Sequence, residues 1–224
     1  MISADHLKDI AFWSRDLDEE AFEQARKGIV ERTFPMGSYI CHRGDRLDAW
    51  TGVAVGLVKL STISKTGKAI SLAGIRAGGW FGEGTILKDE PRQYDLVALR
   101  DTRMALMNRP TFLWLFENSV AFNRFLVRQF NERLGQFIAL VEYDRMLDAT
   151  SRLARNIVWL FNPVFYPAPE MHLEISQEEI GALSGISRQA ANKGLKSLEK
   201  MGFIRIERGG ITVIDLKRLS HYGE

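Results

Sequence analysis

Residues 176–215 constrain the fold most, because they predict two capped helices about a glycine turn, followed by a hairpin. Ser176 is placed to cap the first helix, and Glu179 three residues later completes a capping box. Gly185 turns the chain, and Ser187 caps a second, longer helix. The apolar face that the two helices share consists of Ile180, Leu183, Ile186, Ala191, Leu195 and Leu198. Two short helices about a tight turn predict a helix-turn-helix.

A hairpin is expected directly after the second helix. Residues 202–215 alternate apolar and polar side chains on both sides of Gly209-Gly210, a dipeptide that favours a tight turn. A hairpin in this position is the wing of a winged helix. We therefore predict a winged helix-turn-helix domain over residues 149–224.

Basic residues are in excess on the second helix and the hairpin. Residues 185–208 hold six bases, Arg188, Lys193, Lys196, Lys200, Arg205 and Arg208, against two acids, Glu199 and Glu207. Such an excess suits a surface that faces phosphates, and it also occurs on solvated helix faces. The net charge of the whole chain, +2 at pH 7, does not distinguish these readings.

The first turn of the second helix holds side chains that can reach base edges. Arg188 can bond O6 and N7 of guanine through two N–H groups, and Gln189 can pair with N6 and N7 of adenine. Lys193 lies about one turn later. We predict that the DNA-contacting residues are Ser176, Ser187, Arg188, Gln189, Asn192, Lys193 and Arg208. A helical hairpin used for protein contact is the alternative interpretation.

Short β-rich runs separated by glycine fill residues 38–107. Residues 52–63 and 69–75 are rich in Val, Ile and Leu, and Lys65-Thr-Gly-Lys68 between them is typical of a hairpin turn. Many short strands with turn signals predict a β-barrel or sandwich. Before it, residues 16–28 predict a short helix with acids at its start and bases at its end.

Pro110 opens a helical region that runs to about Tyr143. Side chains recur along it at alternating intervals of four and three, at Leu126, Phe130, Arg133, Phe137, Leu140, Asp144 and Leu147, and Leu134 and Val141 widen this stripe. A long helix with such a stripe needs a partner. We predict a homodimer interface formed by Leu126, Phe130, Phe137, Leu140 and Leu147; packing on its own barrel alone is the alternative.

Composition excludes several classes of protein. Hydrophobic residues make up 46% of the 224 residues, enough to bury a core. The single cysteine, Cys41, cannot build a disulfide framework or an iron–sulfur cluster. No apolar run approaches a membrane span, and the first residues lack the apolar segment of a signal peptide. We expect a cytoplasmic protein that does not associate with membranes, has no metal site and no catalytic residues, and is not an enzyme.

The chain resembles CRP/FNR transcription regulators from about Phe34 to Asp215. The strongest match is the segment Ile175-Ser-Gln-Glu-Glu-Ile-Gly-Ala-Leu-Ser-Gly-Ile-Ser-Arg-Gln-Ala-Ala-Asn-Lys-Gly-Leu195, and Gly44, Gly56 and Gly82-Glu83 match the family's barrel. The resemblance implies an α+β fold: an N-terminal β-roll like cyclic-nucleotide-binding jelly rolls, a long central dimerisation helix and a C-terminal winged helix-turn-helix. We place their boundaries at residues 1–115, 116–148 and 149–224.

The resemblance also implies a function. Such proteins are ligand-responsive regulators that bind near-palindromic operators as homodimers and contact RNA polymerase. The rival hypothesis is a cyclic-nucleotide-binding regulatory protein that acts through protein partners. A recognition helix argues against this rival, because such a protein has no use for one. Neither the operator nor the choice between activation and repression is encoded in the motifs.

The family's effector cassette is present in altered form. In the family a Glu accepts from a ribose hydroxyl, and an Arg followed by a hydroxyl residue neutralises a cyclic phosphate. Here Glu83 and Arg92 match, Gln93 replaces the hydroxyl residue, and the spacing is one residue short. Phe137 and Ile138 replace the hydroxyl residues that meet adenine on the central helix.

The altered cassette leaves the effector open. The candidate effector residues are Gly82, Glu83, Gly84, Arg92, Gln93, Phe137 and Ile138. A cyclic nucleotide, another small acidic effector and an empty pocket are all compatible with them. The alternative for Glu83 and Arg92 is a structural ion pair inside the barrel. These residues therefore identify no specific cofactor.

Overall fold

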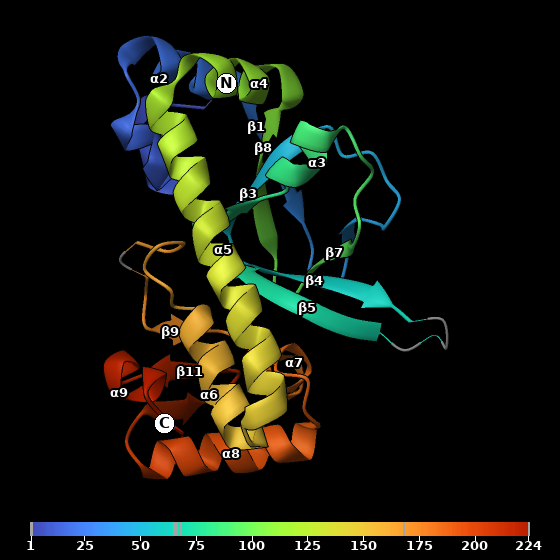
Figure 1. Cartoon of the computed structure of the whole chain (residues 1–224), viewed down its shortest axis with the longest axis vertical. Coiled ribbons are helices and arrows are strands. Elements are labelled where there is room, and N and C mark those ends of the chain that lie inside the picture. The colour runs from blue at the N-terminus through green and yellow to red at the C-terminus, as the bar shows by residue number, and fades with distance from the viewer. Residues whose placement is uncertain (1, 65–66, 68, 168, 224) are drawn as a thin grey trace. The chain divides into compact units, whose positions relative to one another are not determined.

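The computed structural model describes residues 2–64, 67, 69–167 and 169–223. These residues form two compact units (Figure 1). The first holds the chain up to residue 63 together with residues 73–132, and the second holds residues 64–72 together with residues 133 onward. The turn expected at Lys65-Thr-Gly-Lys68 lies outside the described residues except for Gly67.

Two helices and a helical turn begin the first unit. They are α1 (Ala4–Ile10), η1 (Phe12–Asp16) and α2 (Glu19–Gly28). Asp18 caps α2, because its carboxylate accepts from the Ala21 amide at 2.8 Å. The helix expected over residues 16–28 is thus confirmed, and it begins at Glu19. Helices α1 and η1 were not predicted.

Two antiparallel four-stranded sheets form the β-roll. Their strands are β1 (Ile29–Phe34), β2 (Tyr39–Cys41), β3 (Ala49–Val55), β4 (Leu57–Ile63), β5 (Ala69–Arg76), β6 (Trp80–Phe81), β7 (Asp95–Ala98) and β8 (Thr102–Asn108). One sheet has the order β1-β8-β3-β6 and the other β2-β7-β4-β5. The predicted sandwich is confirmed, but it starts earlier, at Ile29, and contains a short helix, α3 (Glu83–Lys88), that was not expected.

Three buried tryptophans form the centre of the larger core of the first unit. The ring centroids of Trp50 and Trp80 lie 4.5 Å apart, and those of Trp13 and Trp50 lie 5.1 Å apart. Trp80 packs directly on the backbone of Gly52, where a Cβ atom would collide with the indole ring. The N-terminal helical segment that carries Trp13 is therefore part of this core.

The helical region after the β-roll consists of two helices. Helix α4 (Arg109–Asn118) ends before Ser119, and α5 (Val120–Met146) follows with 27 residues. Ser119 is extended, with φ −114° and ψ 108°, and its hydroxyl accepts from the Phe122 amide at 3.3 Å. A residue in this conformation ends one helix and caps the next. The long helix is confirmed, and the break at Ser119 was not predicted.

The second unit contains the winged helix. Its helices are α6 (Ala149–Trp159), α7 (Gln177–Leu183), α8 (Arg188–Lys200) and α9 (Leu216–Ser220), and its strands are β9 (His172–Leu173), β10 (Ile204–Glu207) and β11 (Gly210–Val213). The three strands form a sheet in the order β10-β11-β9, below which α8 runs across the domain (Figure 1). The predicted helices and hairpin are confirmed; β9 and α9 were not expected.

Within the described part of the chain, no helix has the length and apolar character that crossing a membrane requires.

Candidate nucleic-acid interface and effector site

Local hydrogen bonds start both helices of the helix-turn-helix. The Ser176 hydroxyl accepts from the Glu179 amide at 3.2 Å, and the Glu179 carboxylate accepts from the Ser176 amide at 2.7 Å. At α8, the Ser187 hydroxyl accepts from the Ala190 amide at 3.2 Å. Gly185 turns the chain between the helices with φ +65°. Ser176 and Ser187 are exposed, and each hydroxyl keeps its own proton for a further acceptor.

Two close approaches hold α8 in place. A Cβ atom at Gly181 of α7 would lie 3.1 Å from the Ala191 Cβ of α8. A Cβ atom at Gly194 of α8 would lie 2.8 Å from Leu153 Cδ2 of α6. These contacts bury one face of α8 and leave the opposite face in solvent. The exposed face carries Arg188, Gln189, Lys193 and Lys196.

The wing turns through Arg208 and Gly209. Glu207 pairs with Gly210 at the end of the hairpin, and Gly209 has φ +83°, a conformation that favours glycine. The side chains of Arg205 and Arg208 are exposed. The wing therefore presents basic side chains of its own in addition to those of α8.

Both acids of the basic segment form bonds within the domain. Glu199 accepts from the Ile206 amide at 2.7 Å and so joins the end of α8 to the wing. Glu207 accepts from the Thr212 hydroxyl at 2.9 Å and lies 3.3 Å from His172 Nδ1. Among the described residues, none of the six basic side chains of the segment forms an ion pair. Their charges are consequently available to an external anion.

Asn192 differs from the other predicted contact residues because it is half-buried. Its side-chain amide donates to the Gln177 side-chain carbonyl at 2.6 Å. No local sequence pattern singles out Gln177 or connects it to a residue in the next helix.

Glu83 of the effector cassette is buried at the start of α3, with 5% exposure. Its carboxylate accepts from the indole N–H of Trp50 at 3.3 Å. Gly82 precedes it with φ +91°. This part of the cassette is thus attached to the tryptophan core.

Arg92 is also buried, with 1% exposure. Its guanidinium donates to the Ala49 carbonyl at 2.8 Å and to the Tyr94 hydroxyl at 3.1 Å. It packs against Gly82, where any Cβ atom would collide with the guanidinium. Burial raises the pKa of the Tyr94 hydroxyl above its usual value, although the nearby Arg92 charge opposes this effect. The structure therefore brings Gly82, Glu83 and Arg92 into one interior site.

The remaining four candidate effector residues are not buried. Gln93 is exposed, and its amide donates to the Pro91 carbonyl at 3.0 Å. Gly84 has open space where a side chain would be. Phe137 and Ile138 are exposed on α5 and belong to the second unit, so their role in an effector pocket stays a prediction.

The structure buries one residue of the predicted α5 seam and leaves the others exposed or half-buried. Leu126, expected at a dimer interface, is only 2% exposed because it packs into the core of the first unit. Phe130, Phe137 and Leu140 are exposed as expected, and Leu147 is half-buried just beyond the helix end. The apolar stripe of α5 that solvent reaches consists of Val120, Val127, Phe130, Leu134, Phe137, Ile138, Leu140, Val141 and Met146.

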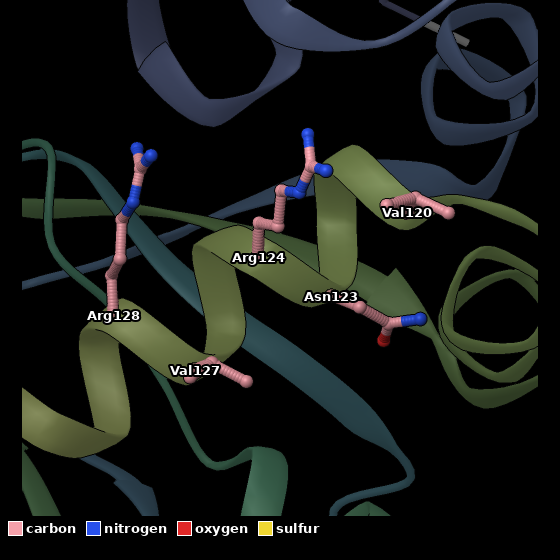
Figure 2. Close-up of a pocket in the computed structure, with 5 residues that line it drawn as sticks. All are labelled: Val120, Asn123, Arg124, Val127 and Arg128. Carbon is pink, nitrogen blue, oxygen red and sulfur yellow. The ribbon is translucent and has the colours of Figure 1, made fainter.

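A shallow groove of about 400 Å³ lies along the start of this stripe. It is lined by Val120, Asn123, Arg124, Val127 and Arg128. Figure 2 shows the two arginines projecting from one side of the helix and the other three residues from the neighbouring side. An apolar stripe with charged flanks is what a helix in a coiled coil presents to its partner.

A β-roll with an interior glutamate and arginine, together with a winged helix that presents a basic helix, defines a sensory DNA-binding regulator. Residues 31–119 match the cyclic nucleotide-binding domain, and residues 151–222 match the Crp-like helix-turn-helix domain. The chain belongs to the CRP/FNR family of transcription regulators.

Curated relatives match this chain over most of their length. The cyclic AMP receptor protein of Thermus thermophilus is 26% identical over 197 residues, which are 88% of this chain and 89% of that protein. The CRP-like cAMP-activated global transcriptional regulator of Mycobacterium tuberculosis is 25% identical over 211 residues, or 91% and 92% of the two chains.

Solved structures share the fold. The catabolite activator protein of Thermus thermophilus matches with a TM-score of 0.52 at 25% identity, covering 93% of this chain and 97% of that one. FixK2 of Bradyrhizobium japonicum matches with a TM-score of 0.69 at 17% identity, covering 85% and 95%. At the latter identity the likeness concerns the fold alone.

Family membership settles the class of function. The chain is a ligand-responsive, DNA-binding transcription regulator and not an enzyme. The partners of such a regulator are double-stranded DNA, RNA polymerase, a second copy of the chain and a small effector. The rival hypothesis, a regulatory protein acting only through protein partners, does not account for the helix-turn-helix match.

Proposed function

We propose that α8 lies in the major groove of the operator with Arg188 and Gln189 at base edges. Lys193, the two cap hydroxyls of Ser176 and Ser187, and Arg208 of the wing then contact the DNA backbone. The observation that carries this proposal is the set of basic side chains in residues 185–208, which are exposed and, within the described ranges of the chain, form no ion pair. The two acids of this segment, Glu199 and Glu207, each accept a hydrogen bond from another residue of the domain. A phosphate backbone that approaches this segment therefore meets exposed positive charges, and both carboxylates of the segment are already hydrogen-bonded within the domain.

A gel-shift assay with random genomic fragments tests the proposal. We expect retention of a subset of fragments, with binding that weakens steeply as salt increases, because each phosphate contact releases counterions. Equal and weak retention of all fragments would contradict base reading by α8. The Arg188→Ala protein serves as the control for retention that depends on base edges.

We propose that the second copy of the chain pairs along the exposed stripe of α5. Val127, Phe130, Leu134, Phe137 and Val141 follow one another at intervals of three and four residues, which is the spacing of a coiled-coil seam. This seam keeps Phe130 and Phe137 of the predicted interface and has Val127 in place of Leu126. It includes Leu134 and Val141 of the widened stripe and leaves out Leu140 and Leu147. Pairing two winged helices in this way presents two recognition helices to a near-palindromic operator.

We propose that the effector carries an anionic group that binds Arg92, with Glu83 accepting a hydroxyl. The guanidinium donates to Ala49 and Tyr94, whereas its buried Nε–H has no hydrogen-bond partner among the described residues, so N–H donors of Arg92 remain for an anion. The named activity of the curated relatives, response to cyclic AMP, makes a cyclic nucleotide the first compound to test. Small acidic metabolites form the second group, because Phe137 and Ile138 offer no polar partner to an adenine.

A thermal-shift screen of the purified protein identifies the effector. A ligand present at about 100 times its dissociation constant adds roughly 2.7 kcal/mol to the free energy of unfolding. The same ligand should lose its effect on the Arg92→Ala protein. An unchanged shift in that variant would place the effector elsewhere.

We further propose that residues 1–115 sense the effector, that residues 116–148 join and pair the subunits, and that residues 149–224 bind DNA. Because a transcription regulator has to reach DNA, we propose that the protein works in the cytoplasm.

A further inference from the structure

A hydrogen bond joins the two helices of the helix-turn-helix at the edge of the proposed DNA-facing surface. The Asn192 side-chain nitrogen Nδ2 donates to Gln177 Oε1 at 2.6 Å. Gln177 is the first residue of α7, and Asn192 lies in the second turn of α8. Both side chains are half-buried, whereas Arg188, Gln189 and Lys193 around Asn192 are exposed.

The packing of the two helices makes this bond possible. Gly181 and Ala191 bring α7 and α8 within van der Waals contact, with 3.1 Å between a Cβ placed at Gly181 and the Ala191 Cβ. Gln177 lies four residues before Gly181 on the same helix face, and Asn192 directly follows Ala191. Asn192 is also four residues from Arg188 and therefore lies on the side of α8 that carries the predicted guanine contact.

The chemistry of the amides decides what the bond leaves free. A carboxamide has two N–H donors and one carbonyl acceptor. Asn192 uses one N–H on Gln177, and in the described part of the chain neither amide makes another hydrogen bond. The remaining N–H and the carbonyl of Asn192 are the donor and acceptor pair that recognises N7 and N6 of adenine.

We propose that Gln177 is a positioning residue for sequence recognition, which fixes the Asn192 amide in the orientation that reads an adenine. An asparagine side chain without a hydrogen-bond partner rotates in the free protein, and it loses this conformational freedom when it binds a base. The bond to Gln177 removes this freedom before DNA arrives, and preorganisation of this kind strengthens the contact that is finally made. The inference rests on the proposed placement of α8 in the major groove.

The test is selection of binding sites from a random DNA library by the full-length protein and its variants. The variants are Gln177→Met, Gln177→Glu, Asn192→Ala and the double change Gln177→Met with Asn192→Ala. Methionine keeps the length of the glutamine side chain and removes the acceptor, whereas glutamate keeps the acceptor. Glu178→Ala, at the neighbouring exposed position of α7, is the matched control.

We expect the native protein to prefer adenine at one half-site position by roughly tenfold or more. Gln177→Met and Asn192→Ala should each lower the preference at that same position to about twofold or less, and the double variant should lose no more than Asn192→Ala alone. Gln177→Glu should keep the preference while weakening binding to all sequences, because it adds a negative charge near the phosphates. Glu178→Ala should leave every base preference unchanged.

Three outcomes would overturn the inference. Asn192→Ala with an unchanged sequence profile would show that Asn192 reads no base. Gln177→Met with a full adenine preference would show that Asn192 reads without its neighbour. A uniform loss of affinity in Gln177→Met, together with a lower melting temperature, would leave Gln177 a purely structural role. A native protein that enriches no sequence would instead contradict the proposed function itself.

Discussion

Trp50 donates its indole N–H to the carboxylate of Glu83 across 3.3 Å, inside the first unit. Trp50 packs against Trp13 and Trp80, so the bond links the effector cassette to the N-terminal helical segment. In the proposed effector site, a change at Glu83 would reach the tryptophan core through this hydrogen bond. The indole rings also give this contact an optical signal.

The Trp50–Glu83 bond should appear as a coupling between the two positions. We expect Trp50→Phe and Glu83→Ala each to lower the free energy of unfolding, and the double variant to lose less than the sum of both. The expected interaction energy is about 0.5–3 kcal/mol, the range for residues in direct contact. Denaturant titrations of the four proteins measure it. Strictly additive losses would mean that the bond contributes nothing.

A side chain at Gly194 should destabilise the protein, because α8 packs closely against α6 at this residue. A Cβ atom would lie 2.8 Å from Leu153 Cδ2, so Gly194→Ala forces Leu153 or the helix to move. We expect a loss of about 1–3 kcal/mol in unfolding free energy, accompanied by weaker DNA binding. Gly135→Ala on exposed α5 is the control, since nothing lies within 4 Å of its Cβ position. It should stabilise the protein by roughly 0.5–1 kcal/mol.

Phe137→Glu should separate the subunits. Phe137 is 66% exposed in the single chain, and a charge at this seam position has no partner when buried in a dimer. Analytical ultracentrifugation should show a folded monomer that binds the operator poorly. Gln136→Glu adds the same charge one residue away and should stay dimeric. Leu126→Glu, by contrast, should unfold the first unit, because Leu126 lies in its core.

Asp148 should make stability depend on acid pH. The carboxylate caps α6 by accepting from the Ser151 amide at 2.8 Å, and this bond holds the pKa of Asp148 below its ordinary value of 3.8. A lowered pKa in the folded state means that the contribution is present above that value and disappears as the pH falls through the folded-state pKa. Asp148→Ala should cost about 1 kcal/mol at neutral pH and nothing once the carboxylate is protonated. Unfolding titrations from pH 7 to pH 2.5 would disprove the account if the difference between the proteins stayed constant.

Features that depend on neighbours in the chain were predictable from the sequence. The caps at Ser176 and Ser187 each bond an amide three residues away, and the wing turn needs only Gly209, which has φ +83°. Such chemistry is complete within a few residues and does not depend on the rest of the fold. The two capped helices and the hairpin of the winged helix could therefore be predicted.

Features that depend on distant packing could not be predicted. Trp50 and Glu83 are 33 residues apart, and Gln177 and Asn192 are 15 apart. The stripe on α5 illustrates the same limit, because Leu126 and Val127 are equally apolar. The first unit buries Leu126 in its core and leaves Val127 exposed. Periodicity defines a stripe, but tertiary packing selects which part of it remains free.

Selection of binding sites from random DNA tests the central claim, that two copies of α8 read one operator. We expect the native protein to enrich an inverted repeat whose half-sites are centred about one DNA turn apart. Arg188→Ala should relax the preference at one guanine in each half by about 1–3 kcal/mol. Lys193→Ala should weaken binding to all sequences and reduce the salt slope by about one unit. Enrichment of a single unrepeated site, or an Arg188→Ala protein that keeps every preference of the native one, would contradict the account.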